Sequence, residues 1–433
     1  MSEGGGDRRR RLRARVGRVA IDLTPLRVSR DFRRIWLGLL VSEAGYHFTL
    51  VATFIQVTEL TNSAAAVGLT GLFGFVGLVI GSVAGSTFLD AFDRRKLLVG
   101  AQVGFIVASS MLLAGAIAGD PPLALIYAAV TLTALTSTID APVRNAMTPR
   151  LIGADLLPSA MALHQVIWNA TGLVGPAIAG VLVARLGVAW AYGVDVATYV
   201  VMLVVAFTVS PMPPEHEGVR PLGWRAVSEG FAYVRRSRLL LSTFAIDIVA
   251  MVFGMPRALF AFLAVSQFDR GTEVVGLLFS APAVGAFVGA AVSGWTRRVQ
   301  RQGLAVVWAV VAWGAAIAAF GLVENLPLAL LLLAAAGWAD VISAIFRSTI
   351  LQLSVPDRLR GRLSAIHMLV VAGGPRLGDV EAGAVAAAFG PTVSVVSGGV
   401  ACIVAAAGVA WRFPELRRYR ADARVGAEGD REG

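Results

Sequence analysis

The sequence contains little charge for its length. Only 15% of its 433 residues are Asp, Glu, Lys or Arg, whereas 56% are hydrophobic and the mean hydropathy is +0.71. Soluble domains carry roughly a quarter charged residues, so this composition excludes a water-soluble enzyme. A chain of this length can instead form about a dozen membrane spans of ~20 residues each.

The chain also has one cysteine and one lysine, Cys402 and Lys96. A single cysteine excludes a disulfide framework, and nothing in the sequence resembles a cluster of metal ligands. No Gly-rich loop is followed by a lysine, as the phosphate-binding loop of many ATP-hydrolysing proteins requires. We therefore expect no metal, no other cofactor and no enzymatic activity.

Long apolar runs are what the sequence has in quantity. A window of ~19 residues finds twelve, at 35–58, 65–88, 97–118, 122–143, 160–184, 189–210, 239–266, 275–295, 304–322, 327–350, 364–389 and 392–411. Segments this apolar must be helical, because lipid offers no partner to backbone amides and the runs lack the alternation of barrel strands. The sequence predicts an all-α integral membrane protein with twelve transmembrane helices.

The basic residues are distributed unevenly between alternate loops. Of the 38 Lys and Arg, 33 lie in the tails and in the loops after even-numbered spans, whereas only Arg185 and Arg270 lie in the other loops. Loops rich in Lys and Arg stay in the cytoplasm. We therefore expect a multi-pass protein of the cell (inner or plasma) membrane with both termini cytoplasmic, so the net charge of +10 reports orientation and does not indicate a nucleic-acid partner.

Residues 211–238 form the longest connection between spans. Four apolar residues in it are spaced as on one face of an amphipathic helix lying on the membrane: Trp224, Val227, Phe231 and Val234. A connection of this kind in mid-chain predicts two six-helix bundles. The expected regions are a cytoplasmic tail (1–34), a first bundle (35–210), this linker (211–238), a second bundle (239–411) and a cytoplasmic tail (412–433).

An internal repeat supports the division into halves. At a constant offset of 208, the second span matches the eighth: Gly68, Gly77 and Gly81 recur as Gly276, Gly285 and Gly289. At a constant offset of 203, a second set of matches is Arg144, His164, Gly175 and Gly180 with Arg347, His367, Gly378 and Gly383. Chance explains one pair in a chain with 47 Gly but not seven. Parallel six-helix repeats are a known transporter plan with the binding site between the halves, so we expect two pseudo-symmetric bundles.

The loop after the second span combines a small residue, an acid and a basic pair: Gly85, Asp90, Arg94 and Arg95. This pattern resembles the loop signature of the major facilitator superfamily, although Ala91 and Asp93 stand where that signature has Arg and Gly. Asp90 can cap a neighbouring helix N-terminus while the Arg residues hold the cytoplasmic face shut. The alternative is the ordinary excess of positive charge in cytoplasmic loops.

Further stretches resemble exporters within that superfamily. Gly175, Pro176 and Gly180 in the fifth span are similar to the exporters' Gly-Pro motif, with ordinary close packing of the helix as the alternative. Residues 188–193, 253–260 and 373–379 resemble the enterobactin-exporter group. This resemblance covers nearly the whole chain and implies proton-driven export of a siderophore-like or other amphipathic small molecule.

Charged residues inside the spans cost roughly 2.5–3.5 kcal/mol each at a helix centre, so each calls for an explanation. They concentrate in spans 1, 4, 7, 10 and 11: Glu43, His47, Asp140, Arg144, Asp247, Arg257, Asp340, Arg347, Arg376 and Asp379. In the superfamily that the chain resembles, spans 1, 4, 7 and 10 line the central cavity. Asp195 in the sixth span lies outside this set.

These charges are candidates for proton coupling or for the cavity wall. Coupling requires a carboxylate whose proton affinity changes between inward- and outward-facing states, and Glu43, Asp247 and Asp340 qualify. Static ion pairs or a wet cavity wall are the alternatives. Arg376 and Asp379, three residues apart on one helix, are expected to pair with each other.

The sequence thus predicts a monomeric secondary transporter with a small-molecule substrate, protons and the lipid bilayer as partners. Within transporters, the alternative is a broad-specificity multidrug exporter. A passive channel or a lipid-handling membrane protein is an alternative from another class. The repeat-related His164 and His367 are interpreted either as a pH-sensing pair or as polar residues at helix ends.

Overall fold

The structure is a computed structural model that describes residues 22–88, 92–213 and 231–420. Over these residues it consists of helices and connecting turns without a strand. The first half contains α2 (Thr24–Val28), α3 (Arg30–Thr61), α4 (Ala64–Phe88), α5 (Arg94–Ala118), α6 (Leu123–Ile152), α7 (Leu157–Leu186) and α8 (Val188–Thr208).

The second half follows the same plan with one interruption. Its elements are α10 (Arg238–Phe253), η1 (Arg257–Leu259), α11 (Phe260–Ser266), α12 (Thr272–Ala291), η2 (Ser293–Arg298), α13 (Gln302–Leu322), α14 (Leu326–Ser354), α15 (Asp357–Phe389), α16 (Pro391–Arg412) and α17 (Pro414–Arg418). Residues 231–236 are also helical. The amphipathic helix expected in the linker falls largely on residues 214–230, which lie outside the described residues.

Eleven helical segments of the described residues are long and apolar enough to cross a membrane, with α10, η1 and α11 counted as one. One further crossing, α15, completes the twelve. It carries Arg376, Asp379 and Glu381 within its length and is therefore less apolar. The expected fold, twelve transmembrane helices in two bundles, is confirmed. Some helices extend beyond the predicted spans: α6 and α14 continue past the apolar run into polar residues. In contrast, α8 and α12 end before the predicted spans do.

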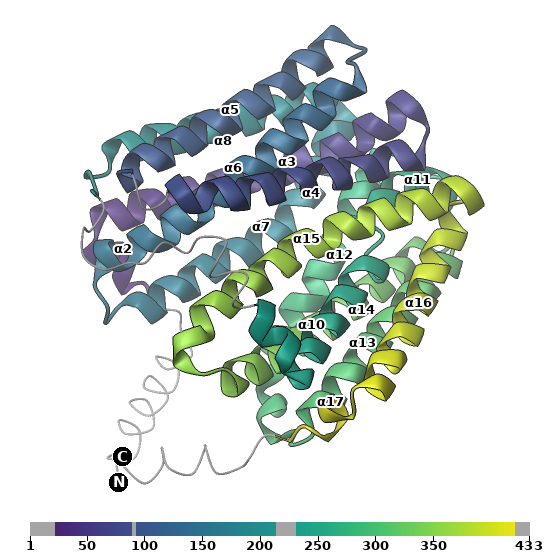
Figure 1. Cartoon of the computed structure of the whole chain (residues 1–433). Coiled ribbons are helices and arrows are strands. Elements are labelled where there is room, and N and C mark those ends of the chain that lie inside the picture. Colours follow the sequence, from purple (N-terminus) through teal and green to yellow (C-terminus); the bar gives the residue numbers. More distant parts are fainter. Residues whose placement is uncertain (1–21, 89–91, 214–230, 421–433) are drawn as a thin grey trace, which may run out of the picture.

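The twelve crossings form two bundles, coloured purple to teal and green to yellow in Figure 1. In the first bundle α3 packs on α7 and α8, and α6 packs on α4 and α5. In the second, α12 and α13 pack on α14, and α10 packs on α15 and α16. The bundles meet mainly through two helix pairs, α4 with α15 and α7 with α12.

Glycines make these two inter-bundle contacts possible. A Cβ atom at Gly68 of α4 would lie 3.0 Å from the Cα atom of Gly383 on α15, and one at Gly180 of α7 would lie 2.9 Å from the Cα atom of Gly276 on α12. Small residues allow helix backbones to approach this closely. These four glycines are two of the pairs in the internal repeat, so the repeat produces two equivalent contacts, both at the ends where α4 and α12 begin.

The seventh crossing is broken between α10 and η1. Gly254 ends α10, and Pro256 lacks the backbone N–H that a continuing helix would use. The Gly254 carbonyl accepts a hydrogen bond from Trp313 Nε1 at 2.8 Å, which satisfies one of the backbone groups that the break releases. The corresponding first crossing, α3, is continuous. The break therefore distinguishes the second half from the first and places Arg257 at the start of η1.

The first membrane-crossing helix of each half, α3 or α10, begins with a serine cap. Ser29 accepts a hydrogen bond from the Phe32 N–H, and Ser237 accepts one from the Leu240 N–H, at 3.2 and 3.4 Å. Side-chain oxygens at this position stabilise the first turn of a helix. The short helix α17 returns to the same end of the second bundle, where Glu415 pairs with Arg238 at 3.2 Å.

Candidate functional site

The first bundle contains an ion network around Arg144 on α6. Its guanidinium lies 2.7 Å from the Asp140 carboxylate and 3.7 Å from that of Glu43 on α3. Gln102 on α5 donates a hydrogen bond to the other oxygen of Asp140 at 2.9 Å. Three helices thus contribute to one buried network that has two carboxylates for one guanidinium.

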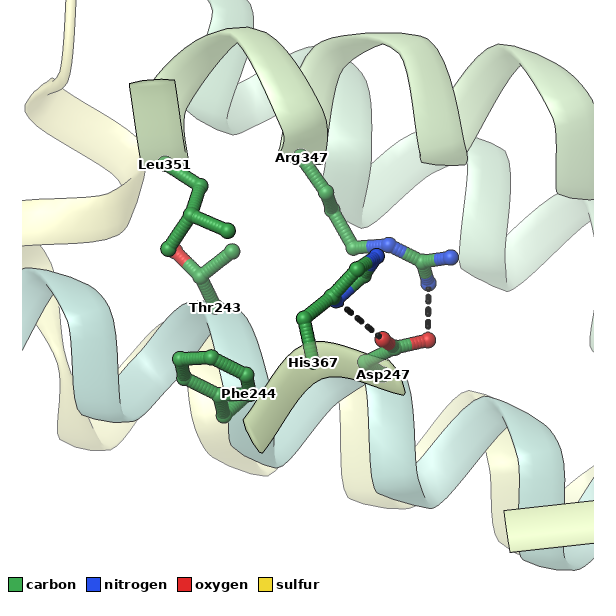
Figure 2. A pocket seen from close by; sticks show the side chains of 6 residues that line it. All are labelled: Thr243, Phe244, Asp247, Arg347, Leu351 and His367. Carbon is green, nitrogen blue, oxygen red and sulfur yellow. Dashed lines mark ion pairs between the residues drawn. The ribbon is translucent and has the colours of Figure 1, made fainter. Parts of the chain in front are cut away.

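The second bundle contains a related network around Arg347 on α14 (Figure 2). Its guanidinium lies 2.9 Å from the Asp247 carboxylate on α10 and 3.8 Å from the carboxylate of Asp340. Asp340 precedes Arg347 by seven residues on α14. His367 on α15 places Nδ1 3.8 Å from the second oxygen of Asp247. The side chains of Arg347 and Asp247 are 3% and 2% exposed, so this pair is enclosed by protein.

The repeat relates the two networks but not all their members. Arg144 and Arg347 occupy equivalent positions, as do His164 and His367, and each His ring lies near a Phe ring: Phe32 at 5.8 Å and Phe244 at 6.3 Å between centroids. The carboxylates come from positions that do not correspond. Each half thus holds an arginine close to two acids, and the acids occupy positions that the repeat does not relate.

A third cluster joins the broken crossing to α15. The Arg257 guanidinium lies 2.7 Å from Asp379, whose side chain is 2% exposed. The expectation that Arg376 pairs with Asp379 is wrong, because Asp379 is taken by Arg257 from another helix. Arg376 instead donates a hydrogen bond to the carbonyl of Ala372 at 3.0 Å, one turn earlier on α15.

A cavity of about 260 Å³ lies beside this cluster. Its wall combines apolar and aromatic side chains with two charged ones, as small-molecule sites commonly do. The aromatic residues of this wall are Trp168, Phe260, Phe279 and Trp313, and its charged residues are Arg257 and Asp340. Trp168 comes from α7 in the first bundle, whereas Phe260, Phe279 and Trp313 come from the second.

His47 and the Gly-Pro motif lie together between α3 and α7. A Cβ atom at Gly175 would lie 2.9 Å from the Cβ atom of His47, so Gly175 lets α7 approach α3. Pro176 is inside α7, and its carbonyl would lie 2.2 Å from a Cβ atom at Gly276. The motif Gly175, Pro176 and Gly180 therefore serves close packing of α7 against helices of both bundles.

The basic pair of the expected gating loop contacts the ends of neighbouring helices. Arg94 donates a hydrogen bond to the carbonyl of Ala146 at 2.8 Å, and Arg95 donates one to the carbonyl of Phe207. Asp93 caps α5 by accepting from the Arg95 N–H at 2.8 Å, although Asp93 stands where the superfamily signature has Gly. Gly85 belongs to α4, and Asp90 lies outside the described residues.

A further buried acid on α8 was not among the expected site residues. Asp195 accepts hydrogen bonds from Thr49 on α3 at 2.6 Å and from Ser109 on α5 at 2.7 Å. Its other oxygen is buried and has no hydrogen-bond donor in the structure. A charged residue inside the sixth span was the feature of the sequence that pointed to Asp195. Its two hydroxyl partners lie on other helices, and no sequence pattern connects them with Asp195.

Comparison with known proteins identifies the family. Residues 20–427 match the sequence family described as transmembrane secretion effectors. The chain belongs to this family, within the major facilitator superfamily.

The chain is similar to curated exporters along nearly its whole length. It is 28% identical to the enterobactin exporter EntS of Citrobacter koseri and 27% identical to that of Shigella boydii, over 92% of this chain and 96% of each relative. These similarities support an efflux transporter of small molecules, and the resemblance inferred from the sequence is confirmed.

Solved structures share its fold. A bacterial homologue of the human lysosomal transporter Spinster, in an inward-facing conformation, has a TM-score of 0.71 at 16% identity and covers 90% of this chain and 98% of its own. A POT family transporter in complex with 5-aminolevulinic acid has a TM-score of 0.73 at 12% identity, with 90% and 97% covered. At these identities the likeness concerns the fold alone.

Proposed function

We propose that the protein is a proton-coupled exporter that works by alternating access and moves a siderophore-like or other amphipathic small molecule out of the cell. The observation that carries this proposal is the surplus of carboxylates around Arg144 and Arg347. Each network has one more acid than it has guanidinium groups, and the more distant acid, Glu43 or Asp340, is only partly buried. An unpaired charge inside a membrane protein raises its free energy. Binding a proton neutralises a carboxylate and removes this cost.

Asp340 is the carboxylate best placed to couple the proton to the substrate. It lines the cavity and also faces Arg347 at 3.8 Å, whereas Asp247 holds Arg347 more closely. A change in the distance between Asp340 and Arg347 alters the affinity of Asp340 for a proton, because an opposite charge favours the ionised form. Movement of the bundles around the cavity therefore links substrate binding to proton release.

The contacts between bundles support alternating access. The glycine contacts of α4 with α15 and of α7 with α12 join the ends where α4 and α12 begin. Under the proposed orientation, with both termini cytoplasmic, these ends face the outside. Such contacts let the bundles rock about a cavity between them, which is how transporters built from two repeats expose one site to each side in turn.

The relatives' name suggests the class of substrate. Both exporters named above are described as enterobactin exporters, and we extend a siderophore-like substrate to this chain. The aromatic wall of the cavity also favours a second candidate, export of varied apolar drugs. We further propose that the protein acts as a monomer in the cell membrane, with the lipid bilayer and protons as its other partners.

Transport in everted vesicles tests the proposal. We expect a proton gradient to drive accumulation of enterobactin, as the siderophore probe, or of ethidium, as the drug probe, and an uncoupler to abolish it. Asp340→Asn is expected to reduce gradient-driven accumulation at least tenfold while exchange of labelled for unlabelled probe continues, because exchange needs no net proton movement. Asp120→Asn, in an exposed loop, is the matched control and should transport normally.

Two outcomes contradict the proposal. A passive channel or a lipid-handling protein would give no accumulation against a gradient, with or without the uncoupler. Normal gradient-driven accumulation by Asp340→Asn would remove this carboxylate from the coupling mechanism.

A further inference from the structure

The cluster at the broken crossing has the opposite charge imbalance to the two proton-binding networks. It contains two guanidinium groups, Arg257 and Arg376, against the single carboxylate of Asp379. Among the described residues, the structure shows no carboxylate within salt-bridge distance of Arg376. The cluster therefore keeps one positive charge that the protein does not neutralise.

The single acid of the cluster forms its ion pair with Arg257. Asp379 Oδ2 accepts a hydrogen bond from the Arg257 guanidinium at 2.7 Å, whereas Oδ1 is buried and has no hydrogen-bond donor. Arg257 belongs to the broken seventh crossing, so the break positions the partner of Asp379. Among the described residues, Asp379 thus pairs with Arg257, and Arg376 forms no ion pair with it.

The two arginines retain donors that the protein does not satisfy. Arg257 Nε is buried and has no hydrogen-bond acceptor. Arg376 donates only one bond that the structure shows, to the Ala372 carbonyl, although a guanidinium has five N–H groups. Its side chain is half-buried against α4, where a Cβ atom at Gly74 would lie 2.9 Å from Arg376 Nε. A larger residue than Gly74 would push this guanidinium away.

Of the two arginines, Arg257 belongs to the wall of the cavity and Arg376 does not. Arg257 lines the cavity together with Phe260 and Phe279, whose rings meet edge to face with centroids 5.0 Å apart, and with Trp313. Asp340 lines the cavity as well, and its negative charge disfavours an anion on its own side. The wall therefore suits a ligand with an aromatic body and one anionic end.

From this arrangement we infer that Arg257, together with the surplus positive charge that Arg376 adds to its cluster, binds an anionic group, a carboxylate or another oxyanion, of an aromatic substrate whose body occupies the cavity. The inference rests on the proposed export function and specifies the chemical class of its substrate. Guanidinium groups bind oxyanions through paired, charge-assisted hydrogen bonds that are stronger than neutral ones. An anion supplies the charge and the acceptors that the cluster lacks.

Binding of matched probes to the full-length protein in lipid nanodiscs tests the inference. The probes are 2-naphthoate, its neutral amide 2-naphthamide and the cation 2-naphthylmethylammonium, measured by competition against tritiated 2-naphthoate. The wild-type protein is expected to bind the carboxylate about tenfold or more tightly than the amide, the increment that one charge-assisted hydrogen bond provides. The cation should bind most weakly.

Substitution of Arg376 locates the preference. Arg376→Gln should reduce the carboxylate-to-amide ratio of affinities to near one while the amide binds as before, and Arg376→Lys should keep part of the preference. Arg376 has no acidic partner, so its replacement leaves no buried acid unpaired. Arg185→Gln, an exposed arginine at the end of α7, is the matched control and should leave the ratio unchanged.

Several results would overturn the inference. Equal affinities of the wild-type protein for carboxylate and amide would do so without any variant, as would the absence of binding by all three probes. A carboxylate preference that survives Arg376→Gln would exclude this cluster. Gradient-driven transport without an anion preference contradicts this inference alone, whereas an anion preference without gradient-driven transport contradicts only the proposed export function.

Discussion

The side chain of Arg347 is 3% exposed and lies between two acids and a histidine. A buried guanidinium is tolerated only where opposite charge and hydrogen-bond acceptors replace the water that it loses. Asp247 supplies most of this replacement at 2.9 Å, and Asp340 contributes from 3.8 Å. The two acids thus differ in role: Asp247 holds the arginine in place, and Asp340 remains available to the cavity.

This difference predicts the effect of removing the arginine. Arg347→Gln leaves Asp247 buried without a strong cationic partner, and breaking a buried pair in this way costs about 3–5 kcal/mol. We expect a marked fall in the thermal unfolding midpoint in detergent, measured by tryptophan fluorescence. The double variant Asp247→Asn with Arg347→Gln removes both charges and should recover most of the loss. Equal midpoints for the single and double variants would show that the charge pair is not the cause.

At the scale of helices, small residues decide where the bundles touch. A Cβ atom at Gly276 would lie 2.2 Å from the carbonyl oxygen of Pro176, so no larger residue fits while α12 rests on α7. The same holds for Gly68 of α4, where a Cβ atom would lie 2.8 Å from the carbonyl oxygen of Asp379 on α15. Close backbone approach is the reason for glycine here, since both residues lie in regular helices.

Gly276→Val is therefore expected to hinder the state in which these helix ends meet. Overpacking costs about 1–3 kcal/mol, which disfavours that state by about fivefold to a hundredfold or more, so gradient-driven transport should fall by about fivefold at least. Gly408→Val on α16 is the control, because nothing lies within 4 Å of a Cβ atom there. Gel filtration checks that both variants are folded. Wild-type transport by Gly276→Val would exclude a role for this contact in the transport cycle.

At the scale of the whole molecule, the two bundles are related by the repeat but differ in chemistry. The arginine-centred networks occur in both halves, whereas the broken crossing, the Arg257 cluster and most of the cavity wall belong to the second half. We therefore expect both bundles to contribute proton-binding carboxylates and the second to contribute most of the substrate site. The repeat accounts for the shared arrangement of helices in the two bundles. The differences between the halves account for the location of most of the cavity wall in the second bundle.

The proposed orientation of the whole molecule can be tested with cysteines. The natural Cys402 is buried, so labelling reports introduced cysteines. Asp120 and Asp155 lie in exposed loops at opposite ends of α6. In intact cells, we expect a membrane-impermeant maleimide to label Asp120→Cys and not Asp155→Cys, while both react after the cells are opened. The reverse pattern would place the termini outside.

Much of the fold follows from the sequence because lipid leaves a chain few choices. Apolar runs long enough to cross a bilayer must be helices, and the offsets between repeated glycines mark two equivalent halves. The pairing of charges was less predictable. Arg376 and Asp379 are neighbours on one helix, yet Asp379 binds Arg257, because the break at Gly254 and Pro256 turns that residue toward α15.

The sequence by itself determined the number of spans, the repeat and the set of charged residues that membrane burial must explain. Hydrophobicity and period are local properties, so they can be read along the chain. Only the tertiary structure decided which acid faces which base, which residues line the cavity and where a positive charge is left over. These depend on distances between helices far apart in the sequence, and a linear pattern contains no such distances.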